Sequence, residues 1–268
     1  MTKVSDVYKF LKKIAPEEMA METDNVGFLV GTSNSDVTNI LISLDITEDV
    51  ITEAIDKNAE VIVAHHPLFF SLSNVNDTDS TGRKVVRLLS NGISAICMHT
   101  NLDAADGGVN DALAVAVGIA DGTRRAEPLS DTVRLSNGDV VSLGRVGSLK
   151  QSCSMADYLA VLKRTLKSNG FKYYDSGRDV RKVAIASGSG GSQWNNAIKS
   201  GCDTFVSADL KYQVFLEARE LGINVIDGGH FCTENVVVSV LKERLSSAFP
   251  AANVMISRVL DQTVEYLV

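Results

Sequence analysis

The strongest constraint on the fold is a repeated alternation of short apolar runs with segments of helical spacing. Residues 40–44 and 61–64 are apolar runs rich in β-branched side chains, and the segment between them has the pattern of a helix. Thr47 is a suitable N-cap for that helix, and Glu48 and Asp49 place negative charge in its first turn. Strand, helix and strand joined by short connections predict a βαβ unit whose parallel strands are covered on both faces.

The alternation continues along the chain and breaks once. Residues 93–98 predict a third strand, whereas residues 133–146 have the pattern of an antiparallel pair that turns at Asn137-Gly138. Alternation of strands and helices then returns and leads to a helix expected to open at Thr233. The expected fold class is α/β, with two α/β lobes whose mostly parallel sheets are flanked by helices.

The break in rhythm gives the expected domain boundary. We place it near residue 126, so that the first lobe spans residues 1–126 and the second spans residues 127–234. The C-terminal helix and strand, about residues 235–268, are expected to pack back on the first lobe.

Composition limits the classes of partner. The formal net charge of the 268 residues is −7, which argues against a nucleic-acid backbone or an anionic membrane as the main partner. The four cysteines have no CxxC spacing, and reduced thiols are therefore expected. Because the sequence has no secretory pattern and no apolar run of the roughly 18 to 20 residues that span a membrane, we expect a cytoplasmic protein.

The histidines are few, and each follows a predicted strand. The four are His65, His66, His99 and His230. A carboxylate stands four residues after each of the last two, namely Asp103 and Glu234. Asp45 and Asp209 also follow predicted strands. Because ligands bind beyond the carboxyl ends of parallel strands, these side chains are the candidate functional site.

The residue types in this cluster favour metal binding. Imidazole and carboxylate together suit zinc, iron, manganese or nickel. His65 and His66 are adjacent on non-helical chain, so we expect their rings to point to opposite sides, which favours two divalent ions per chain over one. Two ions could activate water and stabilise charge on an attacked carbon or phosphorus atom.

Other interpretations of the same residues stay open. Cys97 and Cys232 each lie two residues from a histidine and could join His99 and His230 in a closed structural zinc site. The histidines could also be incidental to an ordinary α/β fold.

Two loops could contribute to a site. Ser187, Gly188, Ser189 and Gly190 lie between a predicted strand and a predicted helix, where backbone N–H groups could cradle an anion or substrate, or form a plain turn. Residues 68–80 are polar and are expected to form a loop that is either mobile or covers a site.

Four motifs along the chain carry a family resemblance. They are Asp24-Asn25-Val26-Gly27, His65-His66-Pro67-Leu68, His99-Thr100-Asn101-Leu102-Asp103 with Gly107-Gly108-Val109-Asn110-Asp111, and Gly229-His230 with Thr233-Glu234. In this order they resemble the NIF-three-like family, whose members are often labelled GTP cyclohydrolase I type 2 homologues. The motifs span most of the sequence.

The resemblance implies a fold, a site and an assembly. It implies a two-lobed α/β protein with a dinuclear metal site in the cleft between the lobes, assembled as a homohexamer of three dimers. The implied metal ligands are His65, His66, Asp103, His230 and Glu234. His99 would act nearby as a second-shell or auxiliary group.

Two functions follow as hypotheses. The first is a metal-dependent hydrolase that acts on a small nucleotide-like or heterocyclic substrate, as a GTP cyclohydrolase does. The alternative is a non-catalytic metal-binding protein with a regulatory or interaction role. The chain departs from many family members at Thr23, where an aromatic residue is common, and this departure bears on the substrate and leaves the metal ligands unchanged.

Overall fold

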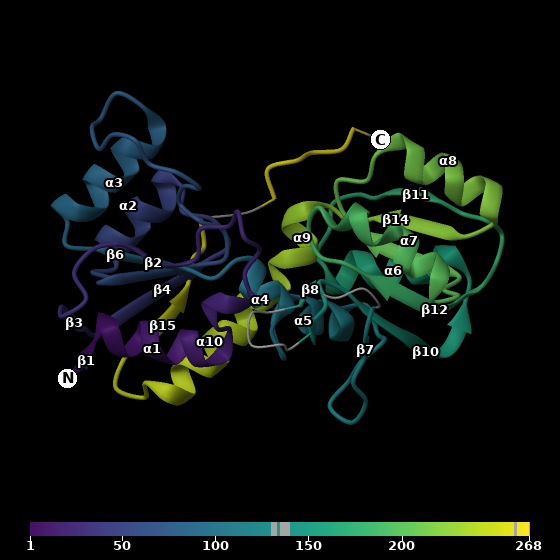
Figure 1. Ribbon diagram of the computed structural model, residues 1–268, viewed down its shortest axis with the longest axis horizontal. Helices are drawn as coiled ribbons and strands as arrows, with labels where there is room; N and C mark the ends of the chain where they lie inside the picture. Colours follow the sequence, from purple (N-terminus) through teal and green to yellow (C-terminus); the bar gives the residue numbers. More distant parts are fainter. Residues whose placement is uncertain (130–132, 135–139, 260–261, 268) are drawn as a thin grey trace. The chain divides into compact units, whose positions relative to one another are not determined.

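Sheets flanked by helices make up the molecule (Figure 1), which confirms the α/β fold class. The computed structural model describes residues 1–129, 133–134, 140–259 and 262–267. Within these residues, no helix is both long enough and apolar enough to cross a bilayer.

The chain divides into two compact units, each with its own sheet. Unit 1 comprises Met1–Ala105 and Val238–Asp261, and unit 2 comprises Asp106–Val237 and Gln262–Val268. The first crossing between units therefore falls earlier than the expected boundary near residue 126.

Unit 1 is built on a five-stranded sheet in the order β15-β4-β5-β6-β2. The strands are β2 (Gly27–Val30), β4 (Asn39–Ser43), β5 (Val61–Ala64), β6 (Ser94–Cys97) and β15 (Asn253–Ile256). All neighbouring pairs are parallel except β2 with β6. The predicted strand–helix–strand unit at the start of the alternation is confirmed as β4, α2 (Glu48–Asp56) and β5.

Helices cover both faces of this sheet. Figure 1 shows α2 and α3 (Ser80–Ser90) on one side and α1 (Val4–Ile14) and α10 (Val236–Ala248) on the other. Thr47 caps α2, as predicted, because its Oγ1 accepts a hydrogen bond of 3.2 Å from the amide of Val50. The remaining elements of unit 1 are β1 (Thr2–Lys3), β3 (Asp36–Val37), η1 (Glu17–Met19) and α4 (Thr100–Ala104).

Unit 2 is built on a six-stranded sheet in the order β11-β14-β13-β12-β10-β7. The strands are β7 (Glu127–Pro128), β10 (Arg145–Cys153), β11 (Lys172–Tyr174), β12 (Val180–Ile185), β13 (Thr204–Ser207) and β14 (Asn224–Asp227). The strands β12, β13 and β14 are parallel to one another. β10 pairs antiparallel with β12, β11 pairs antiparallel with β14, and the edge strand β7 pairs antiparallel with β10.

The two faces of this second sheet carry separate apolar cores. Alternate residues of β12 point to opposite faces, so that Val183 and Ile185 belong to one core and Ala184 to the other. The first core includes α5 (Val109–Ala116) and α6 (Met155–Thr165), and the second includes α7 (Trp194–Lys199) and α8 (Tyr212–Leu221). The shorter elements are η2 (Gly190–Gln193) and α9 (His230–Glu234).

The packing of α5 explains why the units divide where they do. Leu113 and Ala114 of α5 are buried against Tyr158 and Val183 of unit 2. A helix that follows the strand–helix alternation of unit 1 in sequence thus contributes its apolar face to a core of unit 2. Periodicity reveals that a helix has such a face and does not reveal which sheet the face covers.

The antiparallel pair expected over residues 133–146 is present in part. β8 (Val133–Arg134) pairs antiparallel with β9 (Val140–Val141). The expected turn at Asn137-Gly138 lies outside the described residues. Residues 145–146 belong to β10, the long strand that starts the antiparallel side of the sheet of unit 2.

Candidate metal centre

The carboxyl ends of three parallel strands gather the polar side chains of unit 1. The strands β4, β5 and β6 lie next to one another, and Asp45, His66 and His99 follow them. All residues of these strands except Asn39 are buried, and most are apolar, so the chain presents accessible polar side chains only at the ends.

Three imidazole rings lie together at this edge. The ring centroids are 4.9 Å apart for His65 and His66, 5.2 Å for His65 and His99, and 5.5 Å for His66 and His99. One ligand atom from each ring lies within 4.8 Å of those of the other two, which is close enough for one metal ion. We call these three side chains the imidazole group.

The adjacent histidines do not point to opposite sides, so that expectation was wrong. The amides of both His65 and His66 donate to the same carbonyl oxygen, that of Leu44, at 3.1 and 2.9 Å. Consecutive amides reach one acceptor only if the chain bends out of the extended conformation, and the alternation of strand side chains ends there. The adjacent pair therefore gives no reason by itself to prefer two ions over one.

Each ring of the imidazole group is held through its Nδ1 atom. His65 Nδ1 donates to the carbonyl of Met98 at 2.9 Å, and His66 Nδ1 donates to Asp45 Oδ1 at 2.7 Å. His99 Nδ1 lies 2.8 Å from Asp24 Oδ1. A proton held on Nδ1 makes Nε2 the ligand nitrogen, and an oxygen acceptor behind the ring is the usual support for metal-binding histidine.

Asp24 is a functional candidate that sequence reasoning did not single out. Its carboxylate accepts from the His99 ring and, at 3.0 Å, from the amide of Thr100. Burial would raise the pKa of this carboxyl, but the hydrogen bonds from His99 and Thr100 outweigh burial and hold the pKa well below its usual range. The only signal in the sequence was the motif that begins at Asp24.

Asp103 lies beside the imidazole group, on the short helix α4. Its Oδ1 is 3.8 Å from Nε2 of His65, and His65 itself is fully buried. A carboxylate at this position can add a negatively charged oxygen ligand to the imidazole nitrogens. In unit 1 the structure therefore brings together His65, His66 and Asp103, and it places His99 with them as a full member of the imidazole group.

In unit 2, His230 lies between two carboxylates. Its Nδ1 is 2.7 Å from Asp209 Oδ2, and its Nε2 is 3.1 Å from Glu234 Oε2, one helical turn away on α9. The hydrogen bond to Glu234 raises the pKa of His230 to about 9, and Asp209 adds to the rise while burial opposes it. Two carboxylates around one imidazole favour a positive charge there, which a proton or a metal ion can supply.

The loop from Ser187 to Gly190 supports this pair. The amides of Ser187 and Gly188 donate to Asn110 Oδ1 at 3.0 Å and Thr233 Oγ1 at 3.1 Å, and the Gly190 amide donates to the Gly188 carbonyl at 2.7 Å. Two interpretations of this loop were open from the sequence: its N–H groups could cradle an anion or substrate, or the loop could be a plain turn. These N–H groups donate within the protein, so the structure gives the anion interpretation no support.

Gly188 lies directly against the ligand candidates of unit 2. It has a left-handed backbone (φ +54), and a Cβ atom added to it would overlap Glu234 Oε1 and lie 3.2 Å from His230 Nε2. Ser189 Oγ in turn donates to Asp209 Oδ2 at 2.6 Å. The loop thus holds Asp209 by a hydrogen bond, and the missing side chain of Gly188 leaves room for the carboxylate of Glu234.

The cysteines fit a structural zinc site poorly. Cys97 is part of the apolar core of unit 1, and burial raises the pKa of its thiol to about 12. Cys232 is buried in a core of unit 2, and its Sγ lies 2.8 Å from Gln262 Oε1. A thiol kept protonated by apolar surroundings is a poor metal ligand, because the thiolate is the form that binds.

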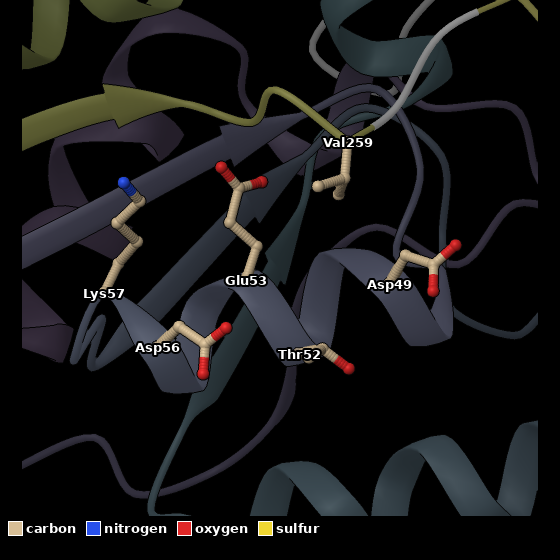
Figure 2. Close-up of a pocket in the computed structure, with 6 residues that line it drawn as sticks. All are labelled: Asp49, Thr52, Glu53, Asp56, Lys57 and Val259. Carbon is tan, nitrogen blue, oxygen red and sulfur yellow. The ribbon is translucent and has the colours of Figure 1, made fainter.

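A separate hollow of unit 1 lies along α2, and no histidine is among the described residues that line it. It encloses about 490 Å³, and Figure 2 shows its lining residues Asp49, Thr52, Glu53, Asp56, Lys57 and Val259. Glu53 is buried and accepts hydrogen bonds from Ser257 Oγ at 2.7 Å and from the amide of Arg258. This carboxylate therefore ties the segment after β15 to α2.

The donor set fits divalent metal ions. Imidazole nitrogens oriented through their Nδ1 atoms, together with carboxylate oxygens, match the ligands that zinc, iron, manganese and nickel take in proteins.

Comparisons with known proteins agree with the sequence motifs. The family model described as Duf34/NIF3 (NGG1p interacting factor 3) matches residues 2–262. A protein of Clostridium perfringens named GTP cyclohydrolase 1 type 2 homolog is 34% identical over 251 residues, which cover 91% of this chain and 93% of that relative. A protein of Clostridium acetobutylicum with the same name is 33% identical, over 92% of this chain and 90% of its own.

Solved structures share the fold. A Bacillus cereus protein related to NIF3 has a TM-score of 0.89 at 23% identity and covers 100% of this chain and 99% of its own. Reduced HcgD from Methanocaldococcus jannaschii has a TM-score of 0.78 at 30% identity, over 95% of this chain and 97% of its own. The chain belongs to the Duf34/NIF3 family, which confirms the resemblance found in the sequence.

Proposed function

We propose that this member of the Duf34/NIF3 family binds two divalent metal ions and hydrolyses a small nucleotide-like or heterocyclic substrate. The proposed ligands are His65, His66, Asp103, His230 and Glu234. One observation carries the proposal: imidazoles held through Nδ1 lie beside carboxylates in each unit. Bound divalent ions would supply Lewis-acid activation of water and of the attacked centre.

Carboxylates of the protein would orient the imidazole ligands and place negative charge beside them. Asp45 and Asp209 each hold one imidazole by a hydrogen bond of 2.7 Å, so each ring turns its Nε2 in a fixed direction. Asp24 does the same for His99, which we propose as a further or auxiliary ligand. Loss of such oxygen partners typically weakens metal binding by about 10- to 100-fold.

The experiment begins with metal content. We expect purified protein, or protein reconstituted with zinc, iron, manganese or nickel, to retain metal that inductively coupled plasma mass spectrometry can count. A His65→Ala His66→Ala variant should lose it. The matched control is Asp49→Asn Asp56→Asn, which removes two acids from the hollow of Figure 2 and should keep the metal.

Turnover is tested with the same proteins. Metal-loaded chain incubated with GTP and related nucleotides should give metal-dependent hydrolysis that the double-alanine variant lacks. Hydrolysis that persists unchanged in that variant would contradict the assignment of the site. The name of the relatives, GTP cyclohydrolase 1 type 2 homolog, makes GTP the first substrate to try.

A non-catalytic role is the second candidate. Asp24, in the segment before β2, accepts hydrogen bonds from His99 and Thr100 at the start of α4. An ion held by the imidazole group would therefore be connected, through His99, to a segment far away in the sequence. This role predicts firmly bound metal and a lower melting temperature after chelation, with no turnover across a broad panel of nucleotides and heterocycles. We further propose that the protein is cytoplasmic and assembles as a homohexamer of three dimers. Sedimentation analysis tests the assembly.

A further inference from the structure

Apolar side chains are exposed on the loop that follows the double histidine. Phe70 is 64% exposed, Val75 53% and Leu72 37%, in a segment that is otherwise polar. Single exposed apolar residues are common on protein surfaces, so exposure alone indicates little. The position of Phe70 relative to the imidazole group is what distinguishes it.

The start of this loop is fixed in place. Leu68 is buried in the apolar core of unit 1, and Phe69 packs against the same core. Asn25 Nδ2 donates a hydrogen bond of 2.7 Å to the carbonyl oxygen of Phe69. Because the two preceding residues are anchored, the backbone at Phe70 is held next to the core while its side chain remains exposed.

The Phe70 ring borders the imidazole group. Its centroid is 6.0 Å from that of His99, and the rings meet edge to face at 66°. His99 is in turn 5.2 Å from His65 and 5.5 Å from His66. An exposed aromatic surface therefore stands beside the nitrogen ligands, and small-molecule sites commonly combine such an apolar wall with a few polar groups.

We propose that Phe70 forms the wall of a ligand subsite beside the imidazole group, and that it selects ligands in which a flat aromatic or heteroaromatic ring carries an oxygen donor for the metal. This subsite rests on the proposed metal function and adds the class of ligand. Aromatic side chains interact favourably with flat rings, in offset or edge-to-face geometry, beyond what the buried area alone contributes. A saturated ring of similar size lacks this interaction.

Two probes isolate ring planarity from metal binding. Benzohydroxamate and cyclohexanecarbohydroxamate carry the same hydroxamate group on a six-carbon ring, which is flat in the first and puckered in the second. Their dissociation constants for the zinc-reconstituted full chain are measured by isothermal titration calorimetry. The ratio of the two constants in one protein cancels most of what the shared hydroxamate contributes.

The variants test Phe70 directly. We expect wild type to prefer benzohydroxamate, and we expect Phe70→Leu to reduce that preference by about 3- to 10-fold. Phe70→Trp restores a flat ring and should keep the preference. Leu89→Ala is the matched control, because Leu89 is 52% exposed on α3 and has no place in the subsite, so its ratio should equal that of wild type.

The outcomes separate the subsite from the metal site. A reduced ratio in Phe70→Leu with zinc content unchanged supports the subsite. Equal ratios in wild type and Phe70→Leu, both with zinc bound, refute the subsite alone. A wild-type chain that retains no zinc refutes the proposed metal function, and the subsite that depends on it falls with it.

Discussion

At the scale of single residues, every histidine of the chain has the same support. Each Nδ1 faces an oxygen: the Met98 carbonyl for His65, and the carboxylates of Asp45, Asp24 and Asp209 for the others. Hydrogen bonds to carboxylates are strong and directional, so they hold a ring in one orientation. In the proposed metal centre, this common arrangement makes Nε2 the nitrogen through which each imidazole would hold a metal ion.

This arrangement gives a prediction for Asp45. Asp45→Asn keeps the shape of the side chain and removes its charge, so we expect the affinity for zinc to fall by about 10- to 100-fold with little change in stability. Competition with a chromophoric chelator measures the affinity. The control is Asp36→Asn, an equally exposed acid that pairs with Lys3, and it should bind zinc as wild type does. Equal affinity in both variants would contradict the role of Asp45.

Gly188 gives a second prediction at this scale. In Gly188→Ala the new methyl group would collide with Glu234, so we expect Glu234 to shift and the zinc affinity to fall at least about tenfold. Gly222→Ala is the matched control, because Gly222 has a similar left-handed backbone (φ +65) with nothing within 4 Å of its added Cβ. It should lose stability through backbone strain and keep its affinity. A loss of affinity in both would assign the effect to strain.

At this scale, the sequence predicted which residues belong to the candidate site, and it did not predict how their side chains are oriented. The histidines and acids were identifiable because they follow apolar runs. The joint orientation of His65 and His66 was not, because it depends on both amides reaching Leu44. The partnership of Asp24 with His99 joins positions 75 residues apart, and no local pattern encodes it.

At the scale of elements, local signals predicted helix starts well where a side chain forms the cap. Thr47 begins α2 through a hydrogen bond to the amide of Val50, as the sequence predicted. The helix expected to open at Thr233 instead begins at His230 as α9 and is followed by α10. Gly229 precedes it without a side-chain cap, so the sequence carried no marker for the true start.

The cap of α2 gives a stability prediction. Thr47→Ala removes the hydrogen bond to the Val50 amide, and we expect it to cost about 1 kcal/mol of unfolding free energy. Urea titration followed by hydrogen exchange of α2 peptides measures it. Thr165→Ala, which loses only an exposed bond to the Val161 carbonyl inside α6, should change stability by less than about 0.5 kcal/mol. Equal effects would show that the cap contributes nothing specific.

At the scale of the whole molecule, the chain returns to unit 1 after completing most of unit 2. β15 pairs in parallel with β4 at four positions, so residues near the C-terminus complete a sheet begun near the N-terminus. The sequence rhythm predicted both sheets. It could not assign α5 to unit 2, because that assignment depends on the packing of the apolar side chains of α5 with Tyr158 and Val183.

Truncation tests this return of the chain. A chain ending at Val237 would lack β15 and nearly all of α10, so that β4, an apolar strand, would become an open edge with less cover on one face of its sheet. We expect fast amide exchange in β4 and β5 by mass spectrometry, with protection retained in β12 and β13 of unit 2. Protection of β4 equal to that in the full chain would show that unit 1 folds without α10 and β15.

The proposed metal centre is tested most directly by anomalous scattering from crystals grown with zinc. The account predicts two peaks roughly 3.5 to 4 Å apart, with His65, His66, Asp103, His230 and Glu234 as their protein ligands. Crystals with no anomalous peak at these side chains, or with zinc bound only at the acids of the hollow in Figure 2, would contradict it.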